Sequence, residues 1–157
     1  MNRSSWNGGN ALTSQEKKLY LQKYKIADRR IDDMLRQKDD MMTRLTKMTA
    51  TLTGMPRGGG GSDTMTAGVA KLIDLDNEID RQVDALVDMR REIEGHINSI
   101  SDDRYKRLLT LRYLDGMTWD RVGLEMGYER RQVTRLHGFA LMDIKIPDAN
   151  ACPWMSH

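Results

Sequence analysis

The sequence predicts an all-α fold, in which a long antiparallel helical hairpin precedes a C-terminal domain of three short helices. Two long stretches of similar length repeat their apolar residues every three or four positions, which is helical spacing. Hydrophobic residues make up 39% of the chain and charged residues 31%, whereas aromatic residues make up only 6%. Such a composition is typical of helices rather than sheets.

The first stretch covers residues 14–53, which contain neither Gly nor Pro. One seam position of a heptad pattern holds Tyr24, Ile31, Lys38, Leu45 and Leu52, and the other holds Ala27, Met34, Met41 and Met48. A stripe this narrow is typical of a coiled coil. The methionines are interpreted as core residues rather than as an adaptable binding groove.

The second stretch covers residues 66–100 and repeats the pattern. Its seam holds Leu72, Ile79, Leu86, Ile93 and Ile100 on one position and Val69, Val83 and Ile97 on the other. A Gly-rich turn at residues 54–63, which contains Pro56 and four consecutive glycines, separates the two stretches. Two helices of matching length joined by a turn predict an antiparallel hairpin. Lys38, Asp76 and Arg90 interrupt the seam, and they either set the register or mark where further chains join.

The predicted organisation has four parts. Residues 1–13 form a disordered N-terminus, and residues 14–100 form the helical hairpin. The C-terminal domain covers residues 101–145, and a disordered tail with two prolines covers residues 146–157.

The C-terminal domain contains recognisable helix boundaries. Ser101 or Asp102 can cap its first helix, which Gly116 ends in a left-handed conformation. Thr118 caps a second helix over residues 119–126, Gly127 makes the turn, and a third helix covers about residues 129–142.

The spacing within these last two helices is typical of a helix-turn-helix. Such a motif needs a small residue where the helices approach, a Gly in the turn and apolar residues that fix the crossing. Gly123 and Gly127 occupy the first two places. The inward-facing positions hold Val122, Met126, Val133, Leu136 and Ala140.

The outer face of the third helix is basic, and we predict that it binds double-stranded DNA. The predicted DNA-binding residues are Thr118, Arg121, Arg130, Arg131, Gln132, Thr134 and Arg135. An arginine can bond O6 and N7 of one guanine together, which contributes about 1–3 kcal/mol of discrimination. Further contacts to phosphates are predicted for Lys106, Arg107, Arg112 and Arg121. The alternative is an ordinary solvated face that pairs with Glu125 and Glu129.

Other chemistry finds little support in the sequence. The net charge of +2, from 25 basic and 23 acidic residues, provides no whole-chain attraction for nucleic acid, so DNA affinity must be local. No nucleophile and base stand together, and Gly58–Gly61 lacks the Lys-Ser or Lys-Thr of a phosphate-binding loop. We therefore predict no enzyme activity, no cofactor and no metal, and we interpret His137 as a packing or hydrogen-bonded histidine.

Cysteine usage and hydropathy bear on the compartment. Cys152 is the only cysteine, so the chain cannot form an internal disulfide, and a reducing cytoplasm is the simplest interpretation. No apolar run reaches the length that a bilayer requires, and the N-terminus is polar. The sequence predicts a cytoplasmic protein, in a bacterial host cell, that makes no contact with a membrane.

Residues 107–123, RLLTLRYLDGMTWDRVG, and residues 130–141, RRQVTRLHGFAL, resemble region 4 of bacterial sigma factors. The stretch from Leu111 to Trp119, the ending from Arg135 to Leu141 and the helical first half resemble phage and prophage regulators of the RinA and ArpU type. These are small activators of late, packaging and structural genes. The resemblance places base-reading positions on Arg130, Arg131, Thr134 and Arg135. The heptad-patterned first half offers no region that grips core polymerase. The resemblance therefore implies an accessory activator rather than a complete initiation factor.

Together these features predict a sequence-specific DNA-binding phage transcription regulator, an activator of late or packaging genes. A homo-oligomer formed through the hairpin would place several recognition helices on repeated sites. Bacterial RNA polymerase is a further expected partner. Two alternatives remain: a phage small terminase subunit that recognises DNA for packaging, and a hairpin that sequesters a host protein beside a merely structural C-terminal domain.

Overall fold

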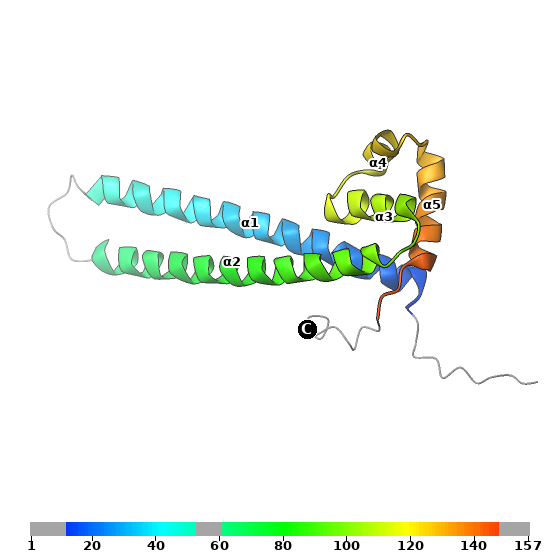
Figure 1. Ribbon diagram of the computed structural model, residues 1–157. Coiled ribbons are helices and arrows are strands. Elements are labelled where there is room, and N and C mark those ends of the chain that lie inside the picture. The colour runs from blue at the N-terminus through cyan, green and yellow to red at the C-terminus, as the bar shows by residue number, and fades with distance from the viewer. Residues whose placement is uncertain (1–11, 53–60, 148–157) are drawn as a thin grey trace, which may run out of the picture. The chain divides into compact units, whose positions relative to one another are not determined.

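The computed structural model describes residues 12–52 and 61–147, and within these ranges it is entirely helical (Figure 1). The elements are α1 (Ser14–Leu52), α2 (Gly61–Asn98), α3 (Asp103–Leu109), the π-helical turn η1 (Thr110–Leu114), α4 (Trp119–Met126) and α5 (Arg130–Asp143). The predicted all-α class is therefore confirmed. Among the described helices, none has a stretch long and apolar enough to cross a bilayer.

The described residues divide into two compact units. The first unit comprises residues 12–25 and 89–147, and the second comprises residues 26–52 and 61–88. Both long helices contribute to both units. The predicted domain boundary at residues 100 and 101 stays a prediction, because shared packing does not decide which part of a chain folds alone.

The second unit is an antiparallel pair made by the distal parts of α1 and α2, which lie side by side (Figure 1). Ile31 and Ile79 are buried in it, with exposed fractions of 7% and 5%. Lys38 on α1 forms an ion pair with Asp76 on α2, so two of the three interruptions of the predicted seam meet each other. This pairing favours a role in setting the register.

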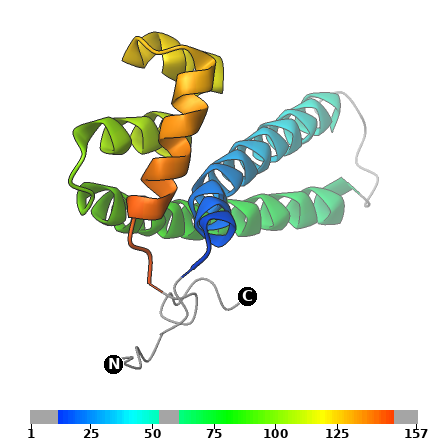
Figure 2. The ribbon, with the colours of Figure 1, turned by 90° about the vertical axis from the view of Figure 1, so that its right-hand side faces the viewer.

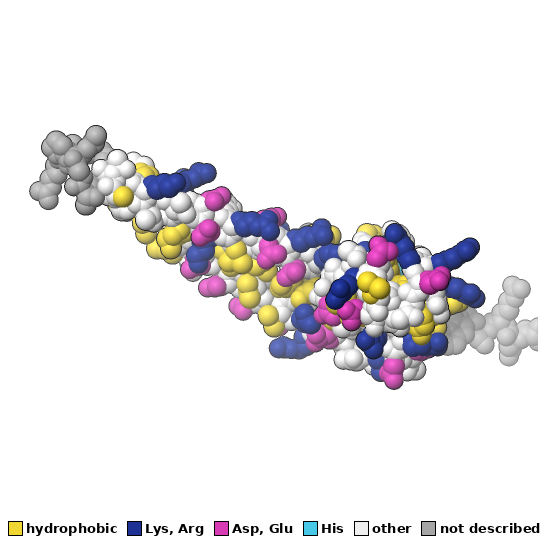
Figure 3. Space-filling view, turned by 90° about the horizontal axis from the view of Figure 1, so that it is seen from above, with side chains coloured by type: hydrophobic (Ala, Val, Ile, Leu, Met, Phe, Trp, Pro, Cys, Tyr) yellow, Lys and Arg dark blue, Asp and Glu magenta, His cyan; other side chains and the backbone are white. Residues whose placement is uncertain are grey.

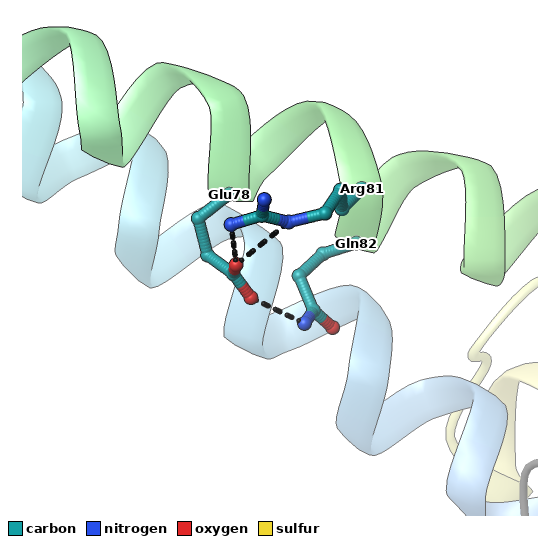
Figure 4. Close-up of polar contacts among 3 residues, drawn as sticks. All are labelled: Glu78, Arg81 and Gln82. Atoms are coloured by element: carbon teal, nitrogen blue, oxygen red, sulfur yellow. Dashed lines mark hydrogen bonds and ion pairs between the residues drawn. The ribbon is translucent and has the colours of Figure 1, made fainter.

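Within the second unit, Arg36 pairs with Asp33 and Arg81 with Glu78 along their own helices. Glu78 accepts hydrogen bonds from Arg81 at 2.5 Å and from Gln82 at 2.7 Å, as Figure 4 shows. Such i,i+3 and i,i+4 contacts stabilise an exposed helix locally. They leave the apolar seam between the helices narrow.

The first unit has a deeper core. Its fully buried side chains come from both long helices and from the C-terminal helices, and include Tyr20, Leu21, Ile93, Ile97, Leu108, Leu109, Val122, Val133 and Ile144. The Nζ atom of Lys17 donates hydrogen bonds to the carbonyl oxygens of Leu141 and Ile144, at 3.0 and 2.6 Å. A cation at the C-terminus of α5 satisfies carbonyls that have no partner within the helix. Lys25 likewise donates to the carbonyl oxygen of Gly116 at 3.2 Å.

The C-terminal helices pack on one another around α5. Figure 2 shows α5 beside α3, with α4 near one end of α5. The predicted caps are confirmed: Asp102 accepts a hydrogen bond from the backbone N–H of Arg104, and Gly116 has a φ of 68°. Both residues stand where the sequence predicts a helix end.

The first of the three short helices differs from the prediction in its last turn. It changes at Thr110 from α-helix to a π-helical turn, in which Asp115 N–H donates to the carbonyl oxygen of Thr110. Residues five apart diverge by about 140° on an α-helix but nearly align on a π-turn. The turn therefore brings Tyr113 and Leu114 onto the same buried side as Leu108 and Leu109.

The described residues can be compared with several of the predicted segment boundaries. Thr13 caps α1, because its Oγ1 accepts from Glu16 N–H while the Glu16 carboxylate accepts from Thr13 N–H at 2.7 Å. Helix α2 begins at Gly61, inside the range predicted as the turn. Ile146, predicted in the tail, is only 8% exposed because it packs into the first unit. The predictions for residues 1–11, 53–60 and 148–157, with Cys152, lie outside the described residues.

Candidate nucleic-acid interface

Helices α4 and α5 are joined by a short turn whose geometry follows from its residues. Thr118 caps α4, and its Oγ1 accepts a hydrogen bond from Arg121 N–H at 3.3 Å. Gly127 ends α4 with a φ of 70°, a left-handed conformation that glycine adopts without strain. Glu129 is extended and precedes α5, so the connection between the helices is three residues long.

Gly123 lets the chain return close to α4. A Cβ atom at this position would lie 2.7 Å from the carbonyl oxygen of Tyr128 and 3.6 Å from Val133 Cγ2. Tyr128 N–H donates to the carbonyl oxygen of Gly123 at 2.9 Å, which holds the two segments together. The predicted close approach at Gly123 is confirmed.

One side of α5 is locked into the core. Val133 and Ala140 are completely buried, and Leu141 is 5% exposed. Leu136, predicted to line this side, is only half-buried, and His137 takes the buried place beside it. At about 100° per residue, Leu136 lies about 40° beyond Ala140, at the edge of the buried side that Val133, His137 and Leu141 share.

All seven predicted DNA-binding residues are exposed. They are Thr118 and Arg121 on or before α4, and Arg130, Arg131, Gln132, Thr134 and Arg135 on α5. At about 100° per residue, Arg130, Thr134, Arg131 and Arg135 occupy an arc of about 140° on α5. Arg131 and Arg135 therefore lie together on the side of α5 opposite Val133 and Ala140, whereas Arg130 lies at the angle of the buried Leu141 and is exposed at the first residue of the helix.

Two of the arginines have acidic neighbours. Arg130 lies 3.4 Å from the Asp120 carboxylate and Arg121 lies 3.1 Å from the Glu125 carboxylate. The Arg130 and Asp120 side chains are 67% and 69% exposed, so solvent screens the pair. Exposed pairs of this kind contribute about 1 kcal/mol or less, and a phosphate can replace the carboxylate at little cost.

Arg131 and Arg135 have fewer contacts within the protein. Among the described residues, Arg131 has no hydrogen-bond or ion-pair partner. The Arg135 guanidinium carbon lies 6.0 Å from the ring centre of Phe139, one turn further along the helix. A cation over an aromatic face keeps its N–H groups directed outward. These two side chains are the freest donors of the predicted set.

The two predicted threonines already serve the backbone. Thr118 Oγ1 caps α4, and Thr134 Oγ1 donates to the carbonyl oxygen of Arg130 at 3.0 Å. Gln132 is exposed with both its donor and its acceptor groups. Thr118 consequently shapes the site, while Gln132 and the arginines form its chemical surface.

The predicted phosphate contacts are partly used within the protein. Arg112 is half-buried, because its guanidinium lies 4.4 Å from the ring centre of Trp119 and donates to the carbonyl oxygen of Met117 at 2.6 Å. Arg112 therefore links η1 to the first residue of α4 through contacts within the protein. Arg107 donates to the carbonyl oxygen of Glu125, and Lys106 lies 3.6 Å from the Asp103 carboxylate.

Behind the exposed side of α5 lies a polar cluster that the sequence analysis missed. The His137 Nε2 and the Tyr113 hydroxyl are 2.8 Å apart, and the Trp119 ring meets the imidazole edge-on at 4.8 Å between centres. Burial, with the charges of Lys18 and Arg112, lowers the pKa of His137 to about 4. Burial also raises the pKa of Tyr113 to about 12.

His137 is thus a neutral, hydrogen-bonded core histidine, as predicted. Its partner is 24 residues away, so helical periodicity could not reveal the pair. The signal present in the sequence was the five-residue spacing of Leu108 with Tyr113 and of Leu109 with Leu114, which suits a π-turn. Within the described ranges, no three His, Cys, Asp or Glu side chains gather as a metal site requires.

A protein-family profile described as "Protein of unknown function (DUF1492)" matches residues 57–144, more than half of the chain. The chain belongs to the DUF1492 family. The DUF1492 region contains α2, α3, η1, α4 and all of α5, and therefore every predicted DNA-binding residue, but not α1. Comparisons with curated proteins and with solved structures found no match.

Proposed function

We propose that this protein is a sequence-specific DNA-binding regulator of transcription, in which α4 and α5 act as a helix-turn-helix and α5 is the recognition helix. The observation that carries the proposal is the two-sided character of α5. One side is buried through Val133, Ala140 and Leu141, and the opposite side exposes Arg131 and Arg135, with Arg130 exposed at the first residue of the helix. A helix of this kind presents donors to base edges from a rigid support.

The turn before α5 adds support. The left-handed Gly127, the close approach at Gly123 and the capped start of α4 are the local features that a helix-turn-helix requires. The resemblance of residues 107–141 to region 4 of sigma factors points to promoter DNA. On that resemblance we propose an accessory activator of phage late or packaging genes, which works as a homo-oligomer through the hairpin, with the two long helices as a coiled coil, and contacts RNA polymerase in the bacterial cytoplasm.

The first test is selection of binding sites from random duplex DNA, followed by affinity measurements with point variants. Arg131→Ala and Arg135→Ala should each weaken binding to the selected site about tenfold or more, because each removes a contact worth about 1–3 kcal/mol. Arg131→Lys keeps the charge but loses the two-bond contact to guanine, so its loss should be specific to the selected sequence.

Arg36→Ala is the matched control, because Arg36 is equally exposed but lies on α1 of the second unit, paired with Asp33. It should leave DNA affinity unchanged. If all four variants bind the selected duplex as tightly as the wild type and still prefer it over random duplexes, the assignment of α5 as the recognition helix is overturned.

The second test separates transcription from packaging. Purified polymerase should produce more transcript from a promoter next to the selected site when the protein is added. Binding to that site without any change in transcript would overturn the activator role and favour the small terminase alternative.

A further inference from the structure

The antiparallel pair of the second unit exposes a stripe of four apolar residues with two aspartates in its middle. On α2 it follows the positions Val69, Ile73, Asp76, Asp80, Val83 and Val87, with alternating steps of four and three residues. Its apolar members are between 38% and 55% exposed. A stripe with heptad steps is the pattern by which a helix packs along another helix. The stripe borders the seam that the buried Ile79 marks, and at Asp76 it reaches Lys38 on α1. The prediction that Val69 and Val83 lie in the seam is wrong, because they are 43% and 38% exposed.

Helix α1 adds to the same face of the pair. At about 100° per residue, Leu35 and Met42 are displaced around the axis of α1 from the buried Ile31. The direction of this rotation is the same as that of the α2 stripe relative to Ile79. Because the two helices are antiparallel, equal senses of rotation lead to the same face of the pair. Leu35 is 46% exposed and Met42 is 50% exposed.

Among the described residues of the second unit, every charged residue that lies about 20–120° around its helix from the buried Ile31 or Ile79, on this side, is acidic. The set consists of Asp28, Asp32 and Asp39 on α1 with Asp76 and Asp80 on α2. We call this surface, with Leu35, Met42, Val69, Ile73, Val83 and Val87, the acidic-apolar face. In Figure 3 hydrophobic and acidic side chains gather along one edge of the long pair, and Lys and Arg side chains follow the other edge.

The opposite face of the same pair has the complementary character. Arg30 and Lys71 lie in the mirror-image arcs, and Arg44 and Asp74 both lie about 20° beyond them, so cations exceed carboxylates on this face by one when Glu78 is included. Glu78 is the acidic residue described in those arcs, and it is occupied by Arg81 and Gln82 (Figure 4). Apolar contacts are available here from Met34, Met41 and Met48. We call this surface the basic face.

We propose that the acidic-apolar face binds the basic face of a second copy of this chain, helix pair against helix pair. The inference rests on the oligomer in the proposed function and specifies its interface. Two acidic-apolar faces would bring like charges together, which is unfavourable, whereas unlike faces attract each other. A pair of helices about 40 Å long and about 20 Å wide presents roughly 800 Å² per partner, the size of a standard stable interface.

Contact between unlike faces has a consequence for assembly. Each copy keeps one face of each kind unoccupied after it pairs, so a third copy can add in the same way. Such heterologous contacts produce either a closed ring or a filament. The number of copies then depends on the rotation between neighbours.

The test is sedimentation equilibrium of the full chain with two face variants. The double variant Arg30→Glu/Lys71→Glu makes the basic face acidic, and the triple variant Asp32→Lys/Asp39→Lys/Asp80→Lys makes the acidic-apolar face basic, with three Lys against the remaining Asp28 and Asp76. Each variant alone should dissociate, with the association constant lowered at least roughly tenfold, because its two faces now carry like charges. Equimolar mixing of the two variants should restore assembly, because each face then meets its opposite.

Controls keep folding and DNA binding separate. Asp40→Lys and Lys47→Glu change exposed residues on the side of α1 that faces away from α2, so they should leave assembly unchanged. Circular dichroism reports whether each variant remains helical. A wild-type chain that stays monomeric, or a mixture that fails to reassemble, would overturn the interface, while DNA selection and Arg131→Ala would still test α5 independently.

Discussion

The two compact units bury their apolar residues to different extents. In the first unit the side chains of Leu21, Ile93 and Leu108 have no exposed surface at all. Among the described residues of the second unit, only Ile31 and Ile79 are buried, and Leu35, Ile73 and Val87 are about half exposed. Since burial of apolar surface is the main stabilising contribution to folding, the first unit holds a core of its own and the second leaves apolar surface exposed.

Truncation of a buried and an exposed side chain on the same helix should show the largest contrast. Leu21→Ala removes a side chain with 0% exposure and should lower the free energy of unfolding by about 2–5 kcal/mol. Ile26→Ala, five residues later, removes one that is 64% exposed and should change it by less than about 0.5 kcal/mol. Urea denaturation measures both, and similar losses would contradict the division into units.

The buried histidine of the first unit should make its stability depend on pH. Burial lowers the pKa of His137 to about 4 from 6.5, so below pH 6.5 the unfolded chain binds a proton that the folded chain does not. Stability from this residue is complete above pH 6.5 and is lost as the pH falls towards 4, by about 3 kcal/mol in all. Unfolding free energies measured across this range report the loss.

Other carboxylates titrate in the same range, so the comparison requires a variant. His137→Gln removes the titrating group. The unfolding free energy of the wild type, taken relative to that of the variant, should therefore fall as the pH falls from 6.5 to 4. A wild-type slope identical to that of His137→Gln would therefore contradict the prediction.

Alanine substitutions at two glycines should change the free energy of unfolding by smaller amounts and in opposite directions. Gly123→Ala places a Cβ 2.7 Å from the Tyr128 carbonyl oxygen and should lower the free energy of unfolding by about 1–3 kcal/mol. Gly95→Ala, within α2, meets no atom within 4 Å and should raise it by up to about 1 kcal/mol, because alanine favours helix. Thermal denaturation of both variants checks the signs, and stabilisation by Gly123→Ala would refute the close approach.

The smallest effect concerns the register of the second unit. Lys38→Asp would place a carboxylate beside Asp76 and should lower the free energy of unfolding by about 1 kcal/mol, since both groups are partly exposed. The exchange Lys38→Asp/Asp76→Lys should recover most of that loss. A double-mutant cycle measures the coupling, and no recovery would mean that the ion pair does not set the register.

Most of the secondary structure could be predicted from local sequence. Thr118, Gly116 and Gly127 act through bonds and dihedral angles within a few residues, so their effects are legible without a fold. The same holds for the exposure of Arg131 and Arg135, because helical periodicity places them opposite Val133 and Ala140.

Contacts between residues far apart in the sequence depended on the tertiary structure. From the sequence alone Arg112 is expected to be a free cation, yet its guanidinium lies against the Trp119 ring and donates to the Met117 carbonyl oxygen. Lys17 donates to the carbonyl oxygen of Leu141 at the end of α5, 124 residues away. Periodicity indicates which side of a helix is apolar but not which helix will cover it. The sequence by itself determined the helices, their ends and the basic side of α5, because these depend on neighbouring residues. Only the tertiary structure decided the His137–Tyr113 pair, the caps from α1 and the exposed acidic-apolar face, because burial depends on which surfaces meet.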